Sequence, residues 1–414
     1  MKKLTFLLVI LSFNGLSQVN IKEQLQSAEQ LINEKKYSES AEYLKAIISE
    51  NPSSQEAHYY LGQAYYKPLF VDGLKMQNIN LKLALKSSSE FKKVIEISPY
   101  YSGQVFVLGP YSKIQTIWGS MAMNYILKGI TDSAKWAFLY GKSEGGFNDA
   151  LLEYNKNILA GCDERAIVFT SGDNDTFPIW FLQMIDGYRK DITIINVNLL
   201  NVPWYIKQLK NNYPFGYNNI SLTISDEKID ELRPVQWQET QMELPVNDPL
   251  NKENKIIWTL KPTYENKALL VKDQMILEIL KENKWERPVY FSTTVKESYL
   301  AGLNEYLTLE GLVRKVNTHK KEISPEKILS NINEVYTYNG LKDEHYKYDN
   351  DVKSIYSNYL NLYFILANHF YETGKREEAK EVLSLMLEKF PDDLFRPDLK
   401  NELEELNRKL SEQQ

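Results

Sequence analysis

The chain has 414 residues, enough for two or three domains, and its 43% hydrophobic and 25% charged residues are typical of a globular protein with a core. A net charge of −6 with scattered Lys and Arg argues against nucleic-acid binding, which needs a concentrated basic face. The single cysteine, Cys162, excludes an intrachain disulfide and a multi-cysteine metal site. We expect neither a metal ion nor another cofactor.

Residues 1–17 have the organisation of a secretory signal peptide. Lys2 and Lys3 precede the apolar run LTFLLVILSF, and small residues follow it. The run is shorter than the ~20 residues of a membrane-spanning helix. We therefore expect cleavage between Ser17 and Gln18, and an extracytoplasmic, periplasmic protein that does not span a membrane after cleavage. An uncleaved anchor is the alternative.

The next segment, residues 18–160, is predicted to form helical pairs of the tetratricopeptide (TPR) type. Aromatic, apolar, small and proline residues recur where the 34-residue TPR pattern expects them: Tyr37, Leu44, Pro52, Leu61, Gly62 and Tyr65. Helices of this kind stack into surfaces that bind peptides or proteins. The segment therefore predicts a partner that is an envelope protein or peptide.

Residues 161–320 change period and predict a small parallel sheet with helices. Short runs rich in β-branched residues, at 166–171, 191–200 and 287–295, are typical of buried strands. Between them lie helical patterns at 176–189, 201–212 and 271–283, and two weaker strand candidates at 220–225 and 255–260. This alternation indicates an α/β core with right-handed crossovers.

The sequence FTSGDNDTFP, residues 169–178, joins the first of these strands to a helix. Open α/β sheets place ligands at the carboxyl ends of their strands, and polar residues also follow the other strands. The candidate ligand-binding residues at this edge are Asp173, Asn174, Asp175, Thr176, Asn198, Asn201, Trp204 and Thr293.

Besides a structural Ca²⁺ site, which the missing EF-type pattern disfavours, three interpretations of this edge remain open. In the first, Gly172 relaxes the turn and Asp173 or Asn174 caps the helix. In the second, amides, hydroxyls and carboxylates bind a glycan or a peptide, and Trp204 either stacks on a sugar or packs in its helix. In the third, Asp173 and Asp175 form a D-x-D cation site. Ser171 lacks the G-x-S-x-G pattern of a nucleophile, so we assign no catalytic residue.

The C-terminal segment, residues 321–414, returns to the TPR-like pattern. Its apolar positions, counted back from Pro391, are Tyr363, Leu366, Ala367, Phe370, Ala379, Leu383 and Met386. The predicted fold class is therefore an α/β core flanked on both sides by all-α TPR-like repeats.

The central segment resembles a known family. The resemblance lies in the stretches FTSGDNDTFPIWFLQMIDGYRKDITIINVNLLNVPWYIKQLK, KALLVKDQMILEIL, KWERPVYFSTTV and GLNEYLTLEGLVRKV. These stretches are similar to the extracytoplasmic part of DUF2723 membrane proteins, relatives of the TMEM260-like protein O-mannosyltransferases. The similarity covers about 163–316. In those proteins the transfer chemistry is expected in a membrane domain that has no counterpart here, so no catalytic residue is carried over. The resemblance implies an extracytoplasmic function related to glycosylation or envelope assembly.

These observations predict an exported, non-enzymatic TPR scaffold or binding protein of the cell envelope. Its partner is an envelope protein or peptide, with a glycan as a second ligand class. The alternative is a carbohydrate-active enzyme, or a soluble subunit of a glycosyltransferase, that uses Asp173 and Asp175.

Overall fold

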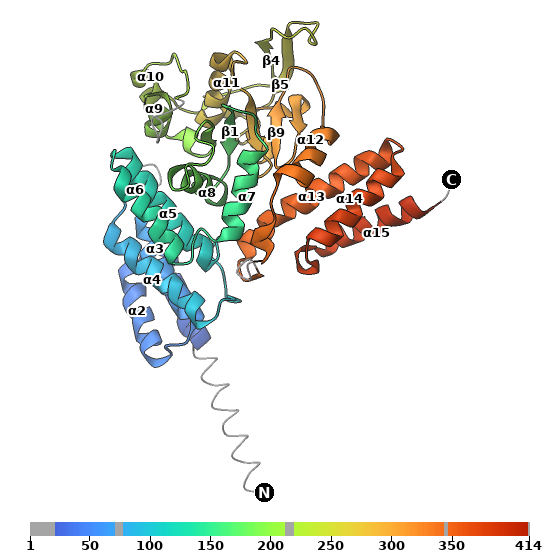
Figure 1. Ribbon diagram of the computed structural model, residues 1–414. Helices are drawn as coiled ribbons and strands as arrows, with labels where there is room; N and C mark the ends of the chain where they lie inside the picture. The colour runs from blue at the N-terminus through green and yellow to red at the C-terminus, as the bar shows by residue number, and fades with distance from the viewer. Residues whose placement is uncertain (1–20, 71–77, 212–218, 343–346, 413–414) are drawn as a thin grey trace. The chain divides into compact units, whose positions relative to one another are not determined.

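The computed structural model describes residues 21–70, 78–211, 219–342 and 347–412 (Figure 1). The expected signal peptide, residues 1–17, lies outside the described residues. The chain divides into two compact units, Met1–Phe147 and Asn148–Gln414, and each is described by itself.

The described residues of the first unit form a series of helices. After a helix at 21–33 they are α2 (Tyr37–Glu50), α3 (Gln55–Tyr66), η1 (Lys67–Leu69), α4 (Leu81–Ile97), α5 (Pro110–Leu127) and α6 (Thr131–Ser143). Each of the helices α2 to α5 packs on the α-helix that follows it. At Gly62 a Cβ would lie 2.8 Å from the Phe91 ring, so α3 and α4 approach closely because this position has no side chain. Local sequence thus fixes both the helices and their contacts.

A five-stranded sheet with the order β2-β1-β7-β9-β8 forms the centre of the second unit. Its strands are β1 (Ile167–Thr170), β2 (Thr193–Asn196), β7 (Val289–Ser292), β8 (Leu307–Leu309) and β9 (Val313–Val316). β1 pairs in parallel with β2 and β7, with Ile167 opposite both Thr193 and Val289. All twelve residues of these three strands are buried, as expected for parallel strands covered on both faces. The three predicted strands of the core are confirmed.

The sheet as a whole is mixed, which corrects the prediction of a purely parallel sheet. β9 runs antiparallel to β7, and β8 runs antiparallel to β9. The β8–β9 pair is short, and the polar Arg314 and Lys315 interrupt its apolar pattern, so the sequence gives little strand signal there.

Helices α8 (Asp173–Met184), α9 (Pro203–Asn211) and α11 (Val271–Asn283) lie where the helical patterns predicted them. A short helix, α10 (Asp226–Glu231), follows α9. The predicted strand at 220–225 is wrong, because the segment pairs with no strand. Ile220 N–H donates instead to Leu209 O at the end of α9, and the side chains of Ile220 and Leu222 are buried without a ladder.

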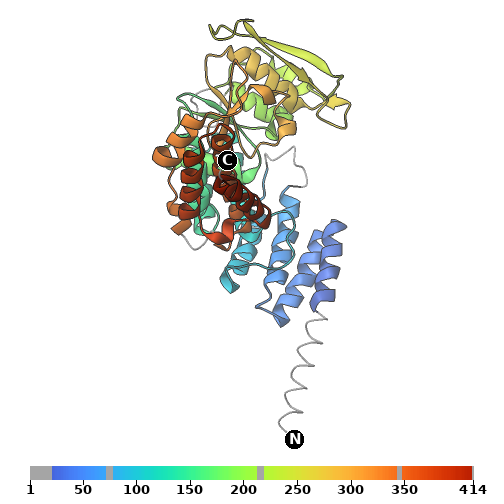
Figure 2. The same cartoon turned by 90° about the vertical axis from the view of Figure 1, so that its right-hand side faces the viewer.

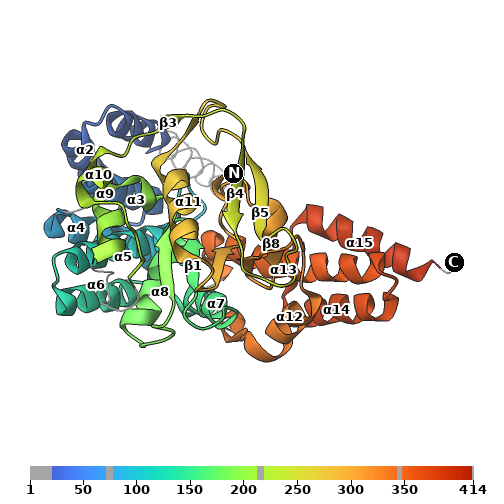
Figure 3. The same ribbon diagram turned by 90° about the horizontal axis from the view of Figure 1, so that it is seen from above.

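Two small antiparallel pairs stand apart from the main sheet. They are β3 (Val235–Gln236) with β6 (Ala268–Leu269), and β4 (Thr240–Pro245) with β5 (Lys255–Leu260). The β4–β5 hairpin extends as a long ribbon (Figure 2). Seen from above, β4 lies between β5 and α11 (Figure 3). The weaker strand candidate at 255–260 is therefore a strand, but of this hairpin.

The remaining helices belong to the same compact unit as the sheet. They are α7 (Asp149–Ala160), α12 (Pro325–Ser330), α13 (Asn350–Glu372), α14 (Arg376–Lys389) and α15 (Pro397–Ser411). The sequence instead predicts residues 149–160 with the N-terminal helices and residues 321–414 in a domain of their own. A tyrosine cluster explains the difference, since it packs α7 and α13 together. Its members are Tyr154, Tyr336, Tyr338, Tyr356 and Tyr359.

Short 3₁₀ and π turns complete the second unit. They are η2 (Leu199–Asn201), η3 (Glu297–Tyr299), η4 (Asn304–Tyr306), η5 (Asn331–Val335), η6 (Asn339–Lys342) and η8 (Asp392–Leu394). Two of them, η2 and η3, follow β2 and β7, so they contribute to the same end of the sheet as the GDNDT sequence.

Candidate functional site

The candidate site is the edge of the sheet at which β1, β2 and β7 end. Because the three strands are parallel, their carboxyl ends meet there. The segments that leave them are 171–172, 197–198 and 293–294. We call this feature the polar edge.

Asp175 ties the end of β1 to the end of β7. Its carboxylate accepts hydrogen bonds from Ser171 N–H (2.9 Å), Ser292 Oγ (3.2 Å) and Thr294 Oγ1 (2.5 Å). The residue is only 3% exposed. Burial raises the pKa of the Asp175 carboxyl to about 6, although these hydrogen bonds oppose the rise. The carboxylate therefore points into the protein and joins two strands.

Thr176, the next residue, ties β1 to β2 on the other side. Its Oγ1 lies 2.8 Å from Thr170 Oγ1 and accepts from Asn196 Nδ2 at 2.9 Å. The residue is fully buried. Asn196 Oδ1 in turn accepts from the backbone of Asn198 (2.9 Å) and so holds the loop after β2. Two consecutive residues of GDNDT thus connect the central strand to both of its neighbours.

Gly172 directly precedes α8, and its backbone conformation favours glycine. Its φ of 84° lies in the left-handed region, while a Cβ there would meet nothing within 4 Å. The turn interpretation holds in this respect, but neither Asp173 nor Asn174 stands at the N-cap position. Gly172 is itself the N-cap residue and has no side-chain cap, and Asp173 and Asn174 are the first two residues of the helix. Both are half-buried.

The other predicted site residues lie along or near the polar edge. Asn198 Nδ2 donates to Ser171 Oγ (3.4 Å), and Asn201 Nδ2 donates to Asn198 O (3.2 Å). Thr293, half-buried after β7, donates its N–H to Leu312 O. Trp204 is half-buried at the start of α9, with its ring edge-to-face against Tyr205 at 5.8 Å. The structure thus joins Asn198 and Asn201 to the GDNDT turn through Ser171.

A buried ion pair, which the sequence analysis missed, lies at the start of α11. Lys272 Nζ is 2.5 Å from Asp273 Oδ1, and the side chains are 2% and 0% exposed. Lys272 N–H donates to Asn201 Oδ1 (3.1 Å), so the pair supports the loop after β2. Asp273 Oδ2 accepts from Thr263 Oγ1 (2.5 Å) and Leu270 N–H (3.0 Å). An Asp three residues after the N-cap was the available signal, because that position reaches back to the cap.

Helix α7 supports the polar edge from behind and was not expected to contribute. Asn155 Nδ2 donates to Asn174 O (3.0 Å) in the first turn of α8. Tyr154 is fully buried and accepts from Asn358 Nδ2 (3.0 Å) on α13. Burial, and then the negative charge of Asp175, raise the pKa of Tyr154. Both α7 residues therefore belong to the framework of the edge.

The D-x-D cation interpretation needs two carboxylates that face one ion. Asp175 is instead enclosed by hydroxyl and amide donors. Over the described ranges, no group of three or more His, Cys, Asp or Glu residues has the arrangement of a metal site. What the edge offers a ligand is mainly hydroxyl and amide groups, at Ser171, Asn198 and Asn201.

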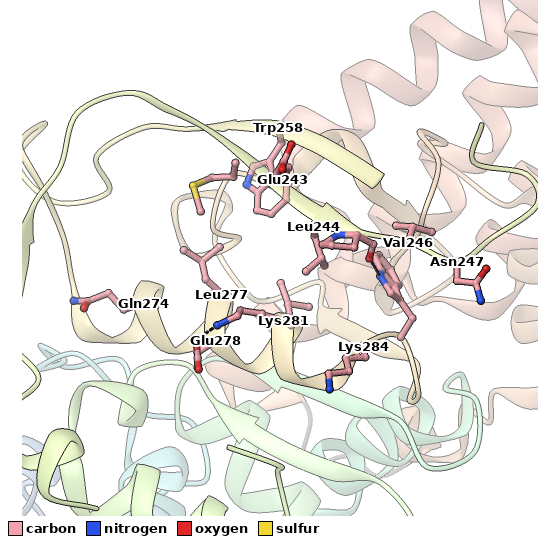
Figure 4. A pocket seen from close by; sticks show the side chains of 14 residues that line it. Glu243, Leu244, Val246, Asn247, Trp258, Gln274, Leu277, Glu278, Lys281 and Lys284 are labelled. Atoms are coloured by element: carbon pink, nitrogen blue, oxygen red, sulfur yellow. Dashed lines mark hydrogen bonds and ion pairs between the residues drawn. The ribbon is translucent and has the colours of Figure 1, made fainter. Parts of the chain in front are cut away.

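A second feature of this unit is a groove of about 740 Å³ between β4 and α11 (Figure 4). Its walls include two indoles, Trp258 and Trp285, and the apolar side chains Met242, Leu244 and Leu277. The sequence analysis did not foresee it, because the groove depends on the packing of a hairpin against a helix far along the chain.

Comparison with known proteins bears on this unit alone. Residues 151–234 and 233–334 match the family model described as TMEM260-associated domain 2. The TMEM260-associated domain 2 match runs from α7 through the polar edge and the groove to η5, and so bears out the resemblance of the central segment. No curated protein and no solved structure matches the chain. In the part of the chain that the structure describes, no helix is long and apolar enough to cross a bilayer.

Proposed function

We propose that the protein is an exported, non-enzymatic binding protein of the cell envelope, accessory to protein glycosylation or envelope assembly. TPR-like helices at both ends of the chain act as a scaffold for an envelope protein or peptide. The central α/β module adds a second recognition surface. Export rests on the signal-peptide pattern of residues 1–17, which is a sequence argument alone.

One observation carries the non-enzymatic proposal. Asp175 is the more buried of the two carboxylates in GDNDT, and its oxygens accept hydrogen bonds from Ser171, Ser292 and Thr294. Paired-carboxylate chemistry requires both groups to reach the substrate, about 5–9.5 Å apart. A carboxylate that joins β1 to β7 supports a role in holding the edge. Hydroxyls and amides nearby suit a ligand that is recognised by hydrogen bonds, such as a glycan or a peptide backbone.

The packing of the helical segments supports the scaffold role. In the first unit α3 packs on α4 and α5 packs on α6, and in the second α13 packs on α14. Gly62, at the TPR-like Leu-Gly position, lies at the α3–α4 contact, and Leu61 beside it is buried. On α6, Trp136 and Leu139 are 40% and 50% exposed, three positions apart, and so form an apolar patch on one helix face.

The scaffold proposal is tested by affinity capture from envelope extracts. With the full chain as bait we expect one defined partner to be enriched, and we expect Leu139→Glu to lose it because a charge replaces the apolar patch on α6. Leu139→Met keeps an apolar side chain of similar volume at the same position, so it is the matched control and should retain the partner. Equal capture by both variants would refute the α6 surface, and no enrichment at all would refute the scaffold.

A second candidate function is a carbohydrate-active enzyme that uses Asp173 and Asp175. The raised pKa of Asp175 favours it, because a carboxyl with a pKa near 6 suits a general acid. Sugar hydrolysis or transfer that disappears in Asp173→Asn, while the Tm is unchanged, would establish this alternative.

A further inference from the structure

The groove between β4 and α11 lies along the edge of a strand. Six consecutive residues, 242–247, line it, and successive residues of a strand alternate between its two faces. Because this wall is lined by residues from both faces of the strand, it must contain the edge of the strand itself. The opposite wall is one face of α11, formed by Gln274, Leu277, Lys281 and Lys284 at helical spacing (Figure 4).

The backbone groups of this strand edge point away from the hairpin. Val246 N–H donates to Asn254 O at 2.8 Å, so residue 246 faces β5. Because backbone groups alternate in direction along a strand, Gln241, Glu243 and Pro245 direct theirs to the outer side. Within the described residues β4 pairs only with β5, so Gln241 and Glu243 offer two N–H and two C=O groups on the outer side.

The groove is closed at one end. Pro245 has no N–H, and its outward carbonyl accepts from Trp285 Nε1 at 2.8 Å. This indole crosses from the end of α11 to β4. The outer edge of β5, by contrast, is already covered, because the Tyr306 hydroxyl bonds to the N–H and the C=O of Ile257 (both 3.2 Å). Within the described ranges, the β4 edge is therefore the more accessible of the two for an added strand.

The charges along the groove are balanced except at the closed end. Glu243 pairs with Lys255 (2.7 Å), and Glu278 lies 3.6 Å from Lys281. Lys284 is exposed beside Trp285 and has no ion pair among the described residues. An acidic group at this end of a bound chain would complement Lys284.

A second copy of the chain is a poor occupant. Antiparallel pairing of two β4 edges about their centre would place Glu243 opposite Glu243 of the other copy, and like charges that face each other across strands are destabilising. Pro245 and the short strand further oppose pairing of two copies.

We propose that the β4–α11 groove binds an extended peptide segment by strand addition to β4. The backbone of the peptide bonds to Gln241 and Glu243, its alternate apolar side chains pack on Met242, Trp258 and Leu277, and an acidic residue lies at the Lys284 end. In this binding mode main-chain hydrogen bonds supply affinity, and alternate side chains supply specificity. The inference rests on the proposed binding function and gives the α/β module a peptide ligand of its own, in addition to the partner held by the helical scaffold.

The first test selects binders from a display library of short random peptides with the immobilised full chain. We expect enrichment of sequences in which apolar and polar residues alternate and an acidic residue stands at one end. The best peptide is then synthesised with and without N-methyl groups on alternate amides, and calorimetry gives both Kd values. Methylation on the bonding side should weaken binding at least about tenfold, because it removes strand hydrogen bonds and leaves the side chains in place.

The second test changes the protein. Glu243→Pro removes an outward N–H that no ladder bond uses, so we expect at least about a tenfold loss of peptide affinity with little change in Tm. Glu243→Ala keeps the N–H and is the matched control, which should bind within about twofold of the wild type. If Glu243→Pro unfolds the hairpin, Leu277→Asp on the opposite wall serves as the test variant instead. We expect it to lose peptide affinity by the same factor.

Several results would overturn the proposal. They are the absence of any enriched peptide, binding that is indifferent to N-methylation or to Glu243→Pro and Leu277→Asp, and binding of glycans alone on a glycan array. Loss of peptide binding in Glu243→Pro with partner capture intact would separate the groove from the scaffold. If the groove fails while capture through α6 persists, the proposed function stands without this site.

Discussion

Asp175 and Thr176 show how neighbouring residues of one motif serve different strands. In the first turn of a helix, successive side chains point about 100° apart, so one reaches towards β7 and the next towards β2. Both are buried, and each is bonded to a residue at the end of a strand. The motif is therefore explained by the edge that it builds, before any ligand is considered.

Thr176→Val tests the hydroxyl that joins β1 to β2. Valine has nearly the same shape but leaves the Asn196 amide and the Thr170 hydroxyl without this buried partner. We expect the free energy of unfolding to fall by about 2–3 kcal/mol, measured by denaturant titration. Thr223→Val makes the same change at an exposed position, where the change should stay within about 0.5 kcal/mol. Equal effects at the two positions would contradict the bridging role.

At the scale of elements, α11 links the two features of the module. Its first turn holds the Lys272–Asp273 pair beneath the polar edge, and its middle and end form a wall of the groove. A buried ion pair contributes little net stability, yet loss of one partner leaves the other charge buried alone. The position of this helix therefore depends on both residues.

Lys272→Met is expected to lower the free energy of unfolding by about 3–5 kcal/mol, because it removes the buried partner of the Asp273 carboxylate. The double variant Lys272→Met and Asp273→Asn should recover part of this loss, since asparagine is neutral and can still accept from Leu270 N–H. A denaturant series on both variants checks the prediction. A double variant less stable than Lys272→Met would show that the charge is not the cause.

The sequence predicted those elements whose signal is local. The runs at 166–171, 191–200 and 287–295 are apolar and β-branched over their whole length, so their strands and the edge at which they end could be predicted. The prediction of a strand at 220–225 was wrong because alternating apolar residues can be buried by packing on α9 without a partner strand. The Lys272–Asp273 pair and the groove could not be foreseen, since they depend on contacts of α11 with Asn201 and with β4.

At the scale of the whole molecule, the second unit combines the sheet with the C-terminal helices. The cause is a buried tyrosine network, in which the Tyr359 hydroxyl accepts from Asn157 on α7 (2.7 Å) and Tyr338 bonds to Tyr363 (3.1 Å). Part of the excess of tyrosine in the chain, 28 residues in all, thus has a structural use in the second unit. The composition shows the excess of tyrosine, but it does not show which helices these residues join.

The central claim is that the Asp175 carboxylate is buried to hold the sheet edge. Its pKa in the folded protein, about 6, lies above the ordinary 3.8, so between these values the folded state binds a proton that the unfolded state releases. The contribution of Asp175 to stability is therefore greatest below about pH 4 and is lost as the pH rises through 6. Asp175→Asn cannot titrate and lacks this dependence.

The deciding measurement is the free energy of unfolding of the wild type and of Asp175→Asn by denaturant titration from pH 4 to pH 8. We predict that, as the pH falls from 7 to 4, the wild type gains roughly 2.4 kcal/mol relative to the variant. A difference between the two proteins that stays constant across this range would contradict the account. It would mean that Asp175 titrates as an ordinary solvated carboxylate, available for a ligand or for catalysis.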